Sequence, residues 1–233
     1  MAQHSNTPNL VRLSRFGFVN AYLVREDDGL TLVDTMISGS AGAILAAAER
    51  AGAPIARIVL THAHGDHAGS LDALAERLPG IEIALSTREA RLMSGDHALT
   101  ADEPQSKLRG GWPKVASRPT RLLEDGDLVG SLRVLAAPGH TPGHIALLDE
   151  RDRTLIAGDA FSTLGGVSTT GRVNPRFPLV GMSTWDRATA NRTAAMLRGL
   201  EPAALAVGHG RLVREPGAAM DRALAKVGAG RAG

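Results

Sequence analysis

The spacing of apolar and polar positions predicts short strands and helices that alternate along the whole chain. Apolar runs of strand length are separated by turn residues such as Asp27-Asp28-Gly29, and alanine- and leucine-rich segments with helical spacing are closed by glycine or proline. We expect strands at 10–15, 18–25, 30–33, 57–60, 81–85, 121–123, 132–136, 144–148, 154–157 and 203–207. We expect helices at 40–51, 69–78, 87–93, 216–227, and from a cap at Ser183 or Thr184 to Leu200.

Two stretches, 94–119 and 161–182, show no clear periodicity. Long irregular insertions often cover a functional site, so we expect both to line a pocket. Around them, strands and helices are followed by strands and helices again, without a repeat and without a linker between two cores. This order predicts an α/β fold with two sheets sandwiched between helices, formed as one domain over residues 1–233.

The composition is that of an ordinary globular protein. Hydrophobic residues make up 43% of the chain and charged residues 21%, and the net charge of +2 comes from 26 basic and 24 acidic residues scattered along it. Because no basic segment is interleaved with aromatic residues, we expect no nucleic-acid partner. Cysteine is absent, which excludes disulfides, thiolate zinc sites and a cysteine nucleophile.

The first residues lack a positive segment followed by an apolar one, and no apolar run approaches the roughly 18 residues that cross a bilayer. We therefore expect a cytoplasmic protein that has no membrane partner and acts on a small-molecule substrate. The sequence leaves the oligomeric state open.

Candidate chemistry concentrates in one segment, which reads Leu60-Thr-His-Ala-His-Gly-Asp-His-Ala68 and follows an apolar strand. A loop that starts extended and turns at glycine can direct His62 and His64 at one ion, and Asp66 and His67 at a neighbouring ion. Imidazole and carboxylate are the ligands that zinc takes when thiolates are absent. Burying such a group without a cation would be costly, so the cluster indicates a metal site.

Three further residues of the same kind follow predicted strands. They are His140, Asp159 and His209, and each lies beside glycine, which allows close approach of the backbone. In layered folds the strand ends converge on one edge, where a site can form.

Together these residues give the chain a resemblance to the metallo-β-lactamase-fold hydrolase superfamily, whose motif is His-x-His-x-Asp-His followed by a distant His, Asp and His. The resemblance extends from the strand that ends at Asp34 to the segment around His209. It implies a four-layer αββα sandwich with a dinuclear metal site. It implies that the first ion is held by His62, His64 and His140, the second by Asp66, His67 and His209, and that Asp159 bridges the two.

Within the superfamily, a bridging Asp159 is typical of the glyoxalase II and lactonase branch and not of the true β-lactamases. The stretch after His209 is shorter than the glutathione-binding region of glyoxalase II. The sole tyrosine, Tyr22, lies early in a strand, so we expect no tyrosine to polarise the substrate as in acyl-homoserine lactonases.

Four neighbouring positions carry weaker signals. The resemblance implies that Asp34 orients a ligand histidine, although Met36 stands where the family commonly has glycine. His144 either orients the site or is a satisfied interior histidine. We expect His4 and His97 to face solvent.

The expected mechanism uses two divalent ions, most simply zinc with iron or manganese as alternatives, that lower the pKa of a shared water from 15.7 toward about 7. The resulting hydroxide attacks a small ester, lactone or thioester, and Asp66 carries the proton to the leaving group. One alternative is a mononuclear-iron persulfide dioxygenase, since histidine and carboxylate also suit iron. A phosphodiesterase is a further alternative, whereas an inert binding module is disfavoured because no ligand position is lost.

The apolar part of the second irregular stretch, residues 177–182, suggests a wall for an acyl or ring group. Its neighbours Arg172 and Arg176 would then be available to an anionic group of the substrate. The alternative is that Phe177 and its neighbours only pack beneath the following helix.

Overall fold

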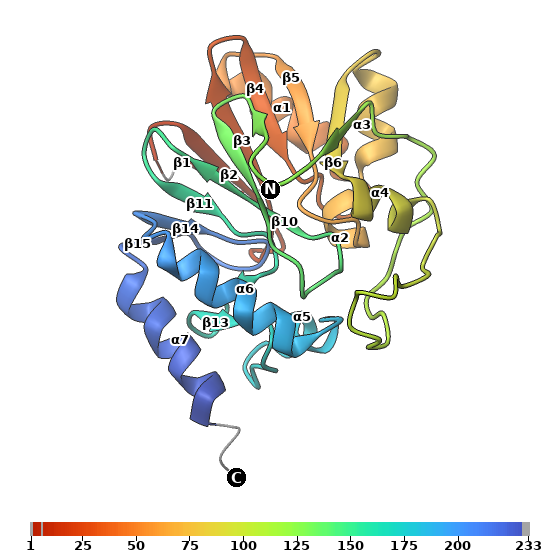
Figure 1. Ribbon diagram of the computed structural model, residues 1–233. Helices are drawn as coiled ribbons and strands as arrows, with labels where there is room; N and C mark the ends of the chain where they lie inside the picture. Colours follow the sequence, from red (N-terminus) through yellow and green to blue (C-terminus); the bar gives the residue numbers. More distant parts are fainter. Residues whose placement is uncertain (1, 6, 230–233) are drawn as a thin grey trace.

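Two β-sheets form the centre of the protein (Figure 1). The computed structural model describes residues 2–5 and 7–229. The first sheet has the strand order β1-β2-β3-β4-β5-β6-β7 and the second the order β15-β14-β11-β10-β9-β8. The strands of the first sheet are β1 (Ala2–Ser5), β2 (Leu10–Arg15), β3 (Val19–Glu26), β4 (Gly29–Val33), β5 (Ile55–Val59), β6 (Glu82–Ser86) and β7 (Arg121–Leu123). Those of the second are β8 (Leu128–Val129), β9 (Leu132–Ala136), β10 (Ile145–Asp149), β11 (Thr154–Ile156), β14 (Ala204–Ala206) and β15 (Val213–Arg214).

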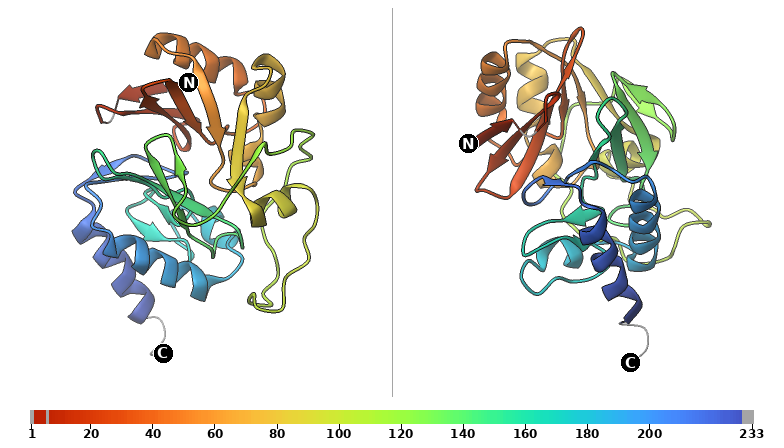
Figure 2. Two further views of the ribbon diagram at one scale, coloured as in Figure 1. Left: turned by 45° about the horizontal axis from the view of Figure 1, so that its top comes forward. Right: turned by 90° about the vertical axis from the view of Figure 1, so that its left-hand side faces the viewer.

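Helices cover the outer face of each sheet (Figure 2). The helices on the side of the first sheet are α1 (Ala41–Ala51), α2 (Gly65–Ala68), α3 (Leu71–Arg77) and α4 (Thr87–Met93). Those on the side of the second sheet are α5 (Leu179–Met182), α6 (Arg187–Gly199) and α7 (Gly217–Ala229). None of the described helices is long and apolar enough to span a bilayer.

Three hydrophobic clusters show why the layers form. In β3, Ala21 and Leu23 pack toward α1 and α3, whereas Tyr22 between them packs between the sheets. In β10, Leu147 joins the same central cluster, and Leu148 packs toward α6 and α7. Since successive side chains of a strand point to opposite faces, a sheet with both faces buried needs a layer on each side. The predicted four-layer αββα arrangement is confirmed.

The structure departs from the expected elements in the second irregular stretch. Residues 161–182 contain a small hairpin of β12 (Phe161–Ser162) and β13 (Ser168–Thr169), followed by α5. The next helix begins at Arg187, because Asp186 caps it by accepting a 2.8 Å hydrogen bond from the Thr189 N–H. The expected cap at Ser183 or Thr184 is therefore wrong: the segment before Asp186 is held on the His140 turn by the bond from Trp185 N–H to His140 O.

Several of the shortest elements, such as β8, β15 and α2, are also absent from the prediction. They are too short to show a hydrophobic period. The first irregular stretch is as expected, since the described chain forms no helix or strand over residues 94–119.

Candidate metal centre

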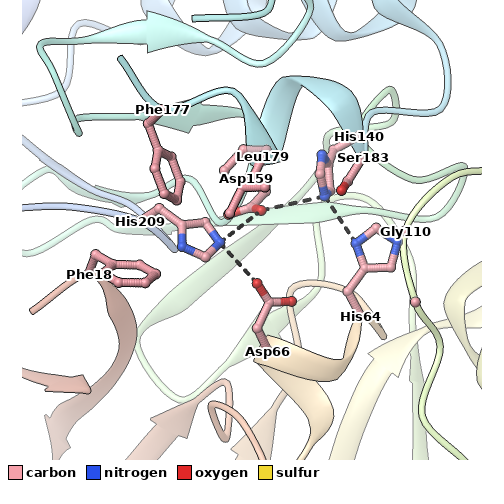
Figure 3. A pocket seen from close by; sticks show the side chains of 12 residues that line it. Phe18, His64, Asp66, Gly110, His140, Asp159, Phe177, Leu179, Ser183 and His209 are labelled. Carbon is pink, nitrogen blue, oxygen red and sulfur yellow. Dashed lines mark hydrogen bonds and ion pairs between the residues drawn. The ribbon is translucent and has the colours of Figure 1, made fainter. Parts of the chain in front are cut away.

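The predicted metal ligands meet at one edge of the sandwich, where strands of both sheets end. Figure 3 shows five of them, His64, Asp66, His140, Asp159 and His209. His62 follows β5, Asp159 follows β11, and His209 follows β14. His140 lies in the turn between β9 and β10. The cluster with His64 continues from β5 into α2, so the single helical turn of α2 carries Asp66 and His67.

Seven side chains gather there in three overlapping groups, each with its ligand atoms within 4.8 Å of one another. Both ends of the cluster contact the central carboxylate: Asp159 Oδ2 lies 3.4 Å from His140 Nε2 and 3.3 Å from His209 Nε2. The groups are His62 with His64 and His140, His62 with His67 and Asp159, and Asp66 with His67 and His209. The structure thus brings together every residue that the sequence nominated as a ligand.

The hydrogen bonds of the first group fix which ring nitrogens are free. Thr61 Oγ1 donates to Asp34 Oδ2 at 2.9 Å, so it accepts from His62 Nδ1, 3.1 Å away. Thr184 Oγ1 donates to Val180 O, so it likewise accepts from His140 Nδ1 at 3.1 Å. These bonds leave the Nε2 atoms of His62 and His140 as acceptors.

In His64 the other ring nitrogen, Nδ1, is the free acceptor. The Nε2 atom of this ring lies 3.1 Å from the carbonyl oxygen of Arg109, which only accepts, so Nε2 carries the hydrogen and Nδ1 is free. His64 Nδ1 and His140 Nε2 are therefore two acceptors facing each other at 3.1 Å. Burial lowers the pKa of His64 to about 4, so this lone pair stays unprotonated at neutral pH.

Buried atoms without a hydrogen bond point into the same space. They are His62 Nε2, His67 Nε2 and Asp159 Oδ1, of which the last two face each other at 3.5 Å, too far for a good hydrogen bond. Leaving such a group unpaired costs roughly 1–3 kcal/mol, and more when the group is charged. A cation at this position satisfies all of them, so the donor set fits a metal centre of nitrogen and oxygen ligands.

In the group of Asp66, His67 and His209, the two histidines are oriented by carboxylates. His67 Nδ1 donates to Asp34 Oδ2 at 2.8 Å, so Asp34 orients one of the candidate ligand histidines, as the resemblance implied. His209 Nε2 lies 3.2 Å from Asp66 Oδ2. Burial opposes the charged form, but Asp159 and Asp66 outweigh it and raise the pKa of His209 to about 9. For His67, burial is likewise outweighed by Asp34 and Asp159, and its pKa lies well above the usual range.

The structure shows how a methionine is accommodated at position 36, where the family commonly has glycine. Met36 has φ +58° and Asp34 has φ +62°, a left-handed conformation that favours glycine. The strain is of order 1–3 kcal/mol per residue and persists only where surrounding contacts outweigh it. The Met36 side chain is fully buried in the cluster beneath α1, which offsets this cost.

Glu89 is a site residue that the sequence prediction missed. Its buried carboxylate accepts from the backbone N–H groups of Ala63 and Gly143, at 3.0 and 3.1 Å, and from the Thr141 hydroxyl. It thereby ties the His62–His67 segment to the turn that carries His140. Burial raises the pKa of Glu89 to about 7. The sequence Ser86-x-x-Glu89 has the form of a capping box, and Ser86 does cap α4, but the carboxylate is used elsewhere.

Two further aromatic side chains fix the backbone at or near candidate ligands. His144 Nδ1 donates to Ala137 O, so its Nε2 accepts the Asp159 N–H at 3.0 Å and fixes that backbone. His144 is thus both satisfied and orienting. The Tyr22 hydroxyl donates to Val207 O at 2.6 Å and accepts from Val207 N–H, two residues before His209. Tyr22 is buried and does not line the pocket.

Close packing around the candidate ligands explains why residue 208 is glycine. A Cβ atom on Gly208 would lie 2.2 Å from Asp159 Oδ1 and 2.5 Å from His67 Cε1. Only glycine fits there, as expected from its place beside His209.

The irregular stretch 94–119 covers the first group. Besides the Arg109 carbonyl, Gly111 O accepts the Gly65 N–H at 2.9 Å, and the Trp112 ring lies 4.8 Å from the His64 ring. Gly110 has φ +92°, and a Cβ there would lie 2.2 Å from His64 Nε2. His97 is exposed, as expected, and its ring lies against Trp112; the His4 side chain is outside the described residues.

The pocket above the ligands is small, about 110 Å³. One wall is apolar and includes Phe18, Phe177, Leu179 and Val180. The Phe177 ring lies 5.6 Å from Phe18 and 5.7 Å from His209. The predicted arginines do not line this pocket: Arg172 and Arg176 line a neighbouring cleft.

Comparisons with known proteins agree with this geometry. The sequence model of the Metallo-beta-lactamase superfamily matches residues 14–209, and the chain belongs to that superfamily. It is 44% identical to the Bacillus subtilis protein "Uncharacterized protein YobT" over 89% of this chain and 90% of the relative. It is 31% identical to "Probable metallo-hydrolase YflN" of Bacillus subtilis over 82% of this chain and 80% of the relative.

Two relatives that match a smaller part of the chain are named for an enzymatic activity. A hydroxyacylglutathione hydrolase of Xanthomonas oryzae pv. oryzae is 32% identical over 61% of this chain and 46% of its own length. The acyl-coenzyme A thioesterase MBLAC2 of Gallus gallus is 34% identical over 51% of this chain and 46% of its own length. Among solved structures, the crystal structure of TTHA1623 in a di-iron-bound form has a TM-score of 0.66 and 27% identity, covering 89% of this chain and 95% of that one. The prediction of a metal-dependent hydrolase of this superfamily is confirmed, and the partial hydroxyacylglutathione hydrolase relative is consistent with the predicted branch outside the true β-lactamases.

Proposed function

We propose that the protein is a hydrolase that uses two divalent metal ions to cleave small esters or thioesters, with lactones as a related class. The observation that carries this proposal is the pair of acceptor nitrogens on His64 and His140, 3.1 Å apart. Two lone pairs repel at this distance unless a cation lies between them.

In this proposal His62, His64 and His140 hold the first ion, Asp66, His67 and His209 hold the second, and Asp159 contributes to both. Bound metal ions supply an acidified water as nucleophile and polarise a substrate carbonyl oxygen. Zinc fits ligands of nitrogen and oxygen, and the di-iron-bound relative keeps iron as a candidate.

Asp66 is the proposed proton carrier. Its side chain is 39% exposed and lines the pocket, whereas Asp159 is buried. Burial opposes ionisation, but the hydrogen bond with His209 holds the pKa of Asp66 well below its usual range. An ionised carboxylate at the pocket wall can take a proton and pass it to a leaving group.

The pocket supports a small apolar acyl group. Phe18, Phe177, Leu179 and Val180 form the apolar wall in a volume of about 110 Å³. The relatives named for hydroxyacylglutathione and acyl-coenzyme A both cleave thioesters by their names, so thioesters come first in a screen.

The test combines metal analysis with hydrolysis. Protein purified without chelator is assayed for zinc, iron and manganese, and is then screened with butyryl-coenzyme A, S-butyryl-N-acetylcysteamine, p-nitrophenyl butyrate and γ-butyrolactone. We expect two metal ions per chain and turnover that is lost with a chelator and regained with metal. A single iron per chain in active protein, or full turnover after chelation, would falsify the proposal.

A further inference from the structure

A second and larger cavity adjoins the segment that bears Phe177. It is a cleft of about 700 Å³ between residues 165–176 and α7. Figure 1 shows α7 beside β13, the strand that leads into this loop. The volume falls within the roughly 300–1,000 Å³ of small-molecule sites, whereas the metal pocket is smaller than that range.

Cations line the cleft, and none of its lining residues is acidic. The four are Arg172, Arg176, Arg222 and Lys226. Arg222 and Lys226 are one helical turn apart on α7 and therefore share a face. The remaining polar lining consists of hydroxyl and amide side chains from the loop, so the surface does not suit an acyl chain.

None of these four cations forms a close ion pair in the part of the chain that the structure describes, although Arg222 lies near enough to Asp221 to lower the pKa of that carboxyl. Arg172 Nη1 donates to Lys226 O at 3.4 Å, and Arg176 Nη1 donates to Gly165 O at 3.2 Å, so both partners are neutral carbonyls. The adjacent carboxylate on α7, Asp221, is paired with Arg198 at 2.8 Å.

Some other arginines of the chain are paired with carboxylates. Arg88 lies 2.6 Å from Glu103, and Arg133 lies 2.8 Å from Glu150. Four cations without a close ion pair around one cleft give it a positive potential, which an anionic ligand would lower.

We propose that this cleft binds a small molecule that carries two or more phosphate groups. Guanidinium groups bind phosphate through paired N–H donors, and Lys226 adds a point charge. The ligand is either the phosphorylated part of the substrate or a separate effector. The idea that these phosphates belong to the substrate rests on the proposed thioester hydrolysis. The cleft and the metal pocket adjoin, because Arg176 lines the cleft and Phe177, the next residue, lines the metal pocket.

Binding is tested on the metal-loaded full chain by calorimetry with adenosine 3′,5′-bisphosphate and with inorganic pyrophosphate, and adenosine serves as the uncharged probe. The double variant Arg222→Gln/Lys226→Gln removes two exposed charges from α7. Lys107→Gln/Arg187→Gln is the matched control, since these cations line a different cleft that also contains Asp186.

We expect the affinity for the bisphosphate to fall about tenfold or more in the α7 variant and with added salt, and to stay unchanged in the control. Full affinity in the α7 variant shows that binding does not use Arg222 and Lys226 and overturns the proposal. Absence of binding by both phosphate probes overturns it as well.

Kinetics separate the two sources of the ligand. Butyryl-coenzyme A and S-butyryl-N-acetylcysteamine share the thioester but differ in phosphates. A KM that rises in the α7 variant for the coenzyme A ester alone supports binding of the substrate's phosphates. An unchanged KM together with lost bisphosphate binding supports a separate effector. If neither thioester is hydrolysed while bisphosphate binding still depends on Arg222 and Lys226, the cleft stands and the thioester proposal fails.

Discussion

The two halves of the metal centre are built from different chemistry. His62, His64 and His140 are oriented by hydroxyl and carbonyl oxygens, and burial keeps their pKa values low. His67 and His209 instead face carboxylates, and their pKa values are raised. The first half therefore offers neutral lone pairs that are ready for a cation, whereas a cation that binds the second half would have to displace protons.

The largest expected effect comes from the residue that joins the two halves. Asp159→Ala should lower metal content at both positions and reduce kcat/KM by more than the ten- to hundredfold that loss of an orienting partner typically costs. Metal analysis and butyryl-coenzyme A hydrolysis provide the readouts. Unchanged metal content in this variant rejects Asp159 as the shared ligand.

Asp66→Asn separates ligation from proton transfer in the second half. The amide keeps an oxygen at the pocket but cannot accept the proton, so kcat should fall by roughly a hundredfold or more while metal content falls less. Near-normal turnover with full metal content would show that another group carries the proton.

Matched changes of the orienting partners test whether the halves are independent. Asp34→Asn should weaken binding of the metal held by His67, and Thr184→Val that of the metal held by His140, each by about ten- to hundredfold. Stepwise metal titration measures the two constants. Loss of both metals in either variant would mean that the halves act as one unit.

The raised pKa of His209, about 9, predicts opposite pH trends with and without metal. Since the metal displaces a proton, its apparent affinity at the second position should rise with pH, up to about tenfold per unit, and level off near pH 9. In metal-free protein the protonated histidine stabilises the fold fully below pH 6.5, and this contribution is lost as the pH rises toward 9. Metal titrations and melting curves at pH 6, 7, 8 and 9 check both trends.

Phe177→Ala should give the smallest effect. Loss of the apolar wall should lower kcat/KM for a butyryl ester or thioester by about tenfold, roughly 1.4 kcal/mol, at nearly unchanged metal content and melting temperature. Loss of the second metal instead would assign Phe177 to holding the His209 ring, whose Nδ1 has no hydrogen-bond partner. Lower stability with normal kcat/KM would assign it to packing alone.

The sequence predicted the features that depend on neighbouring residues better than those that depend on contacts between distant segments. The strand Leu10–Arg15 and the helix Thr87–Met93 have the predicted bounds, because hydrophobic period and caps are local signals. The start of α6 was wrong, because the His140 turn holds the preceding segment by backbone hydrogen bonds that no local pattern shows.

The sequence by itself determined the layered fold and the seven candidate ligands. Continuous apolar runs of strand length specify two buried faces per sheet, and imidazole and carboxylate beside glycine at strand ends specify a metal site. Only the tertiary structure decided which nitrogen of His64 is free, that Glu89 joins two ligand loops, and that Arg172 and Arg176 line a separate cleft with α7. Each of these depends on a hydrogen bond or a packing contact between segments far apart in the chain, and such contacts are fixed by the register of the whole sandwich.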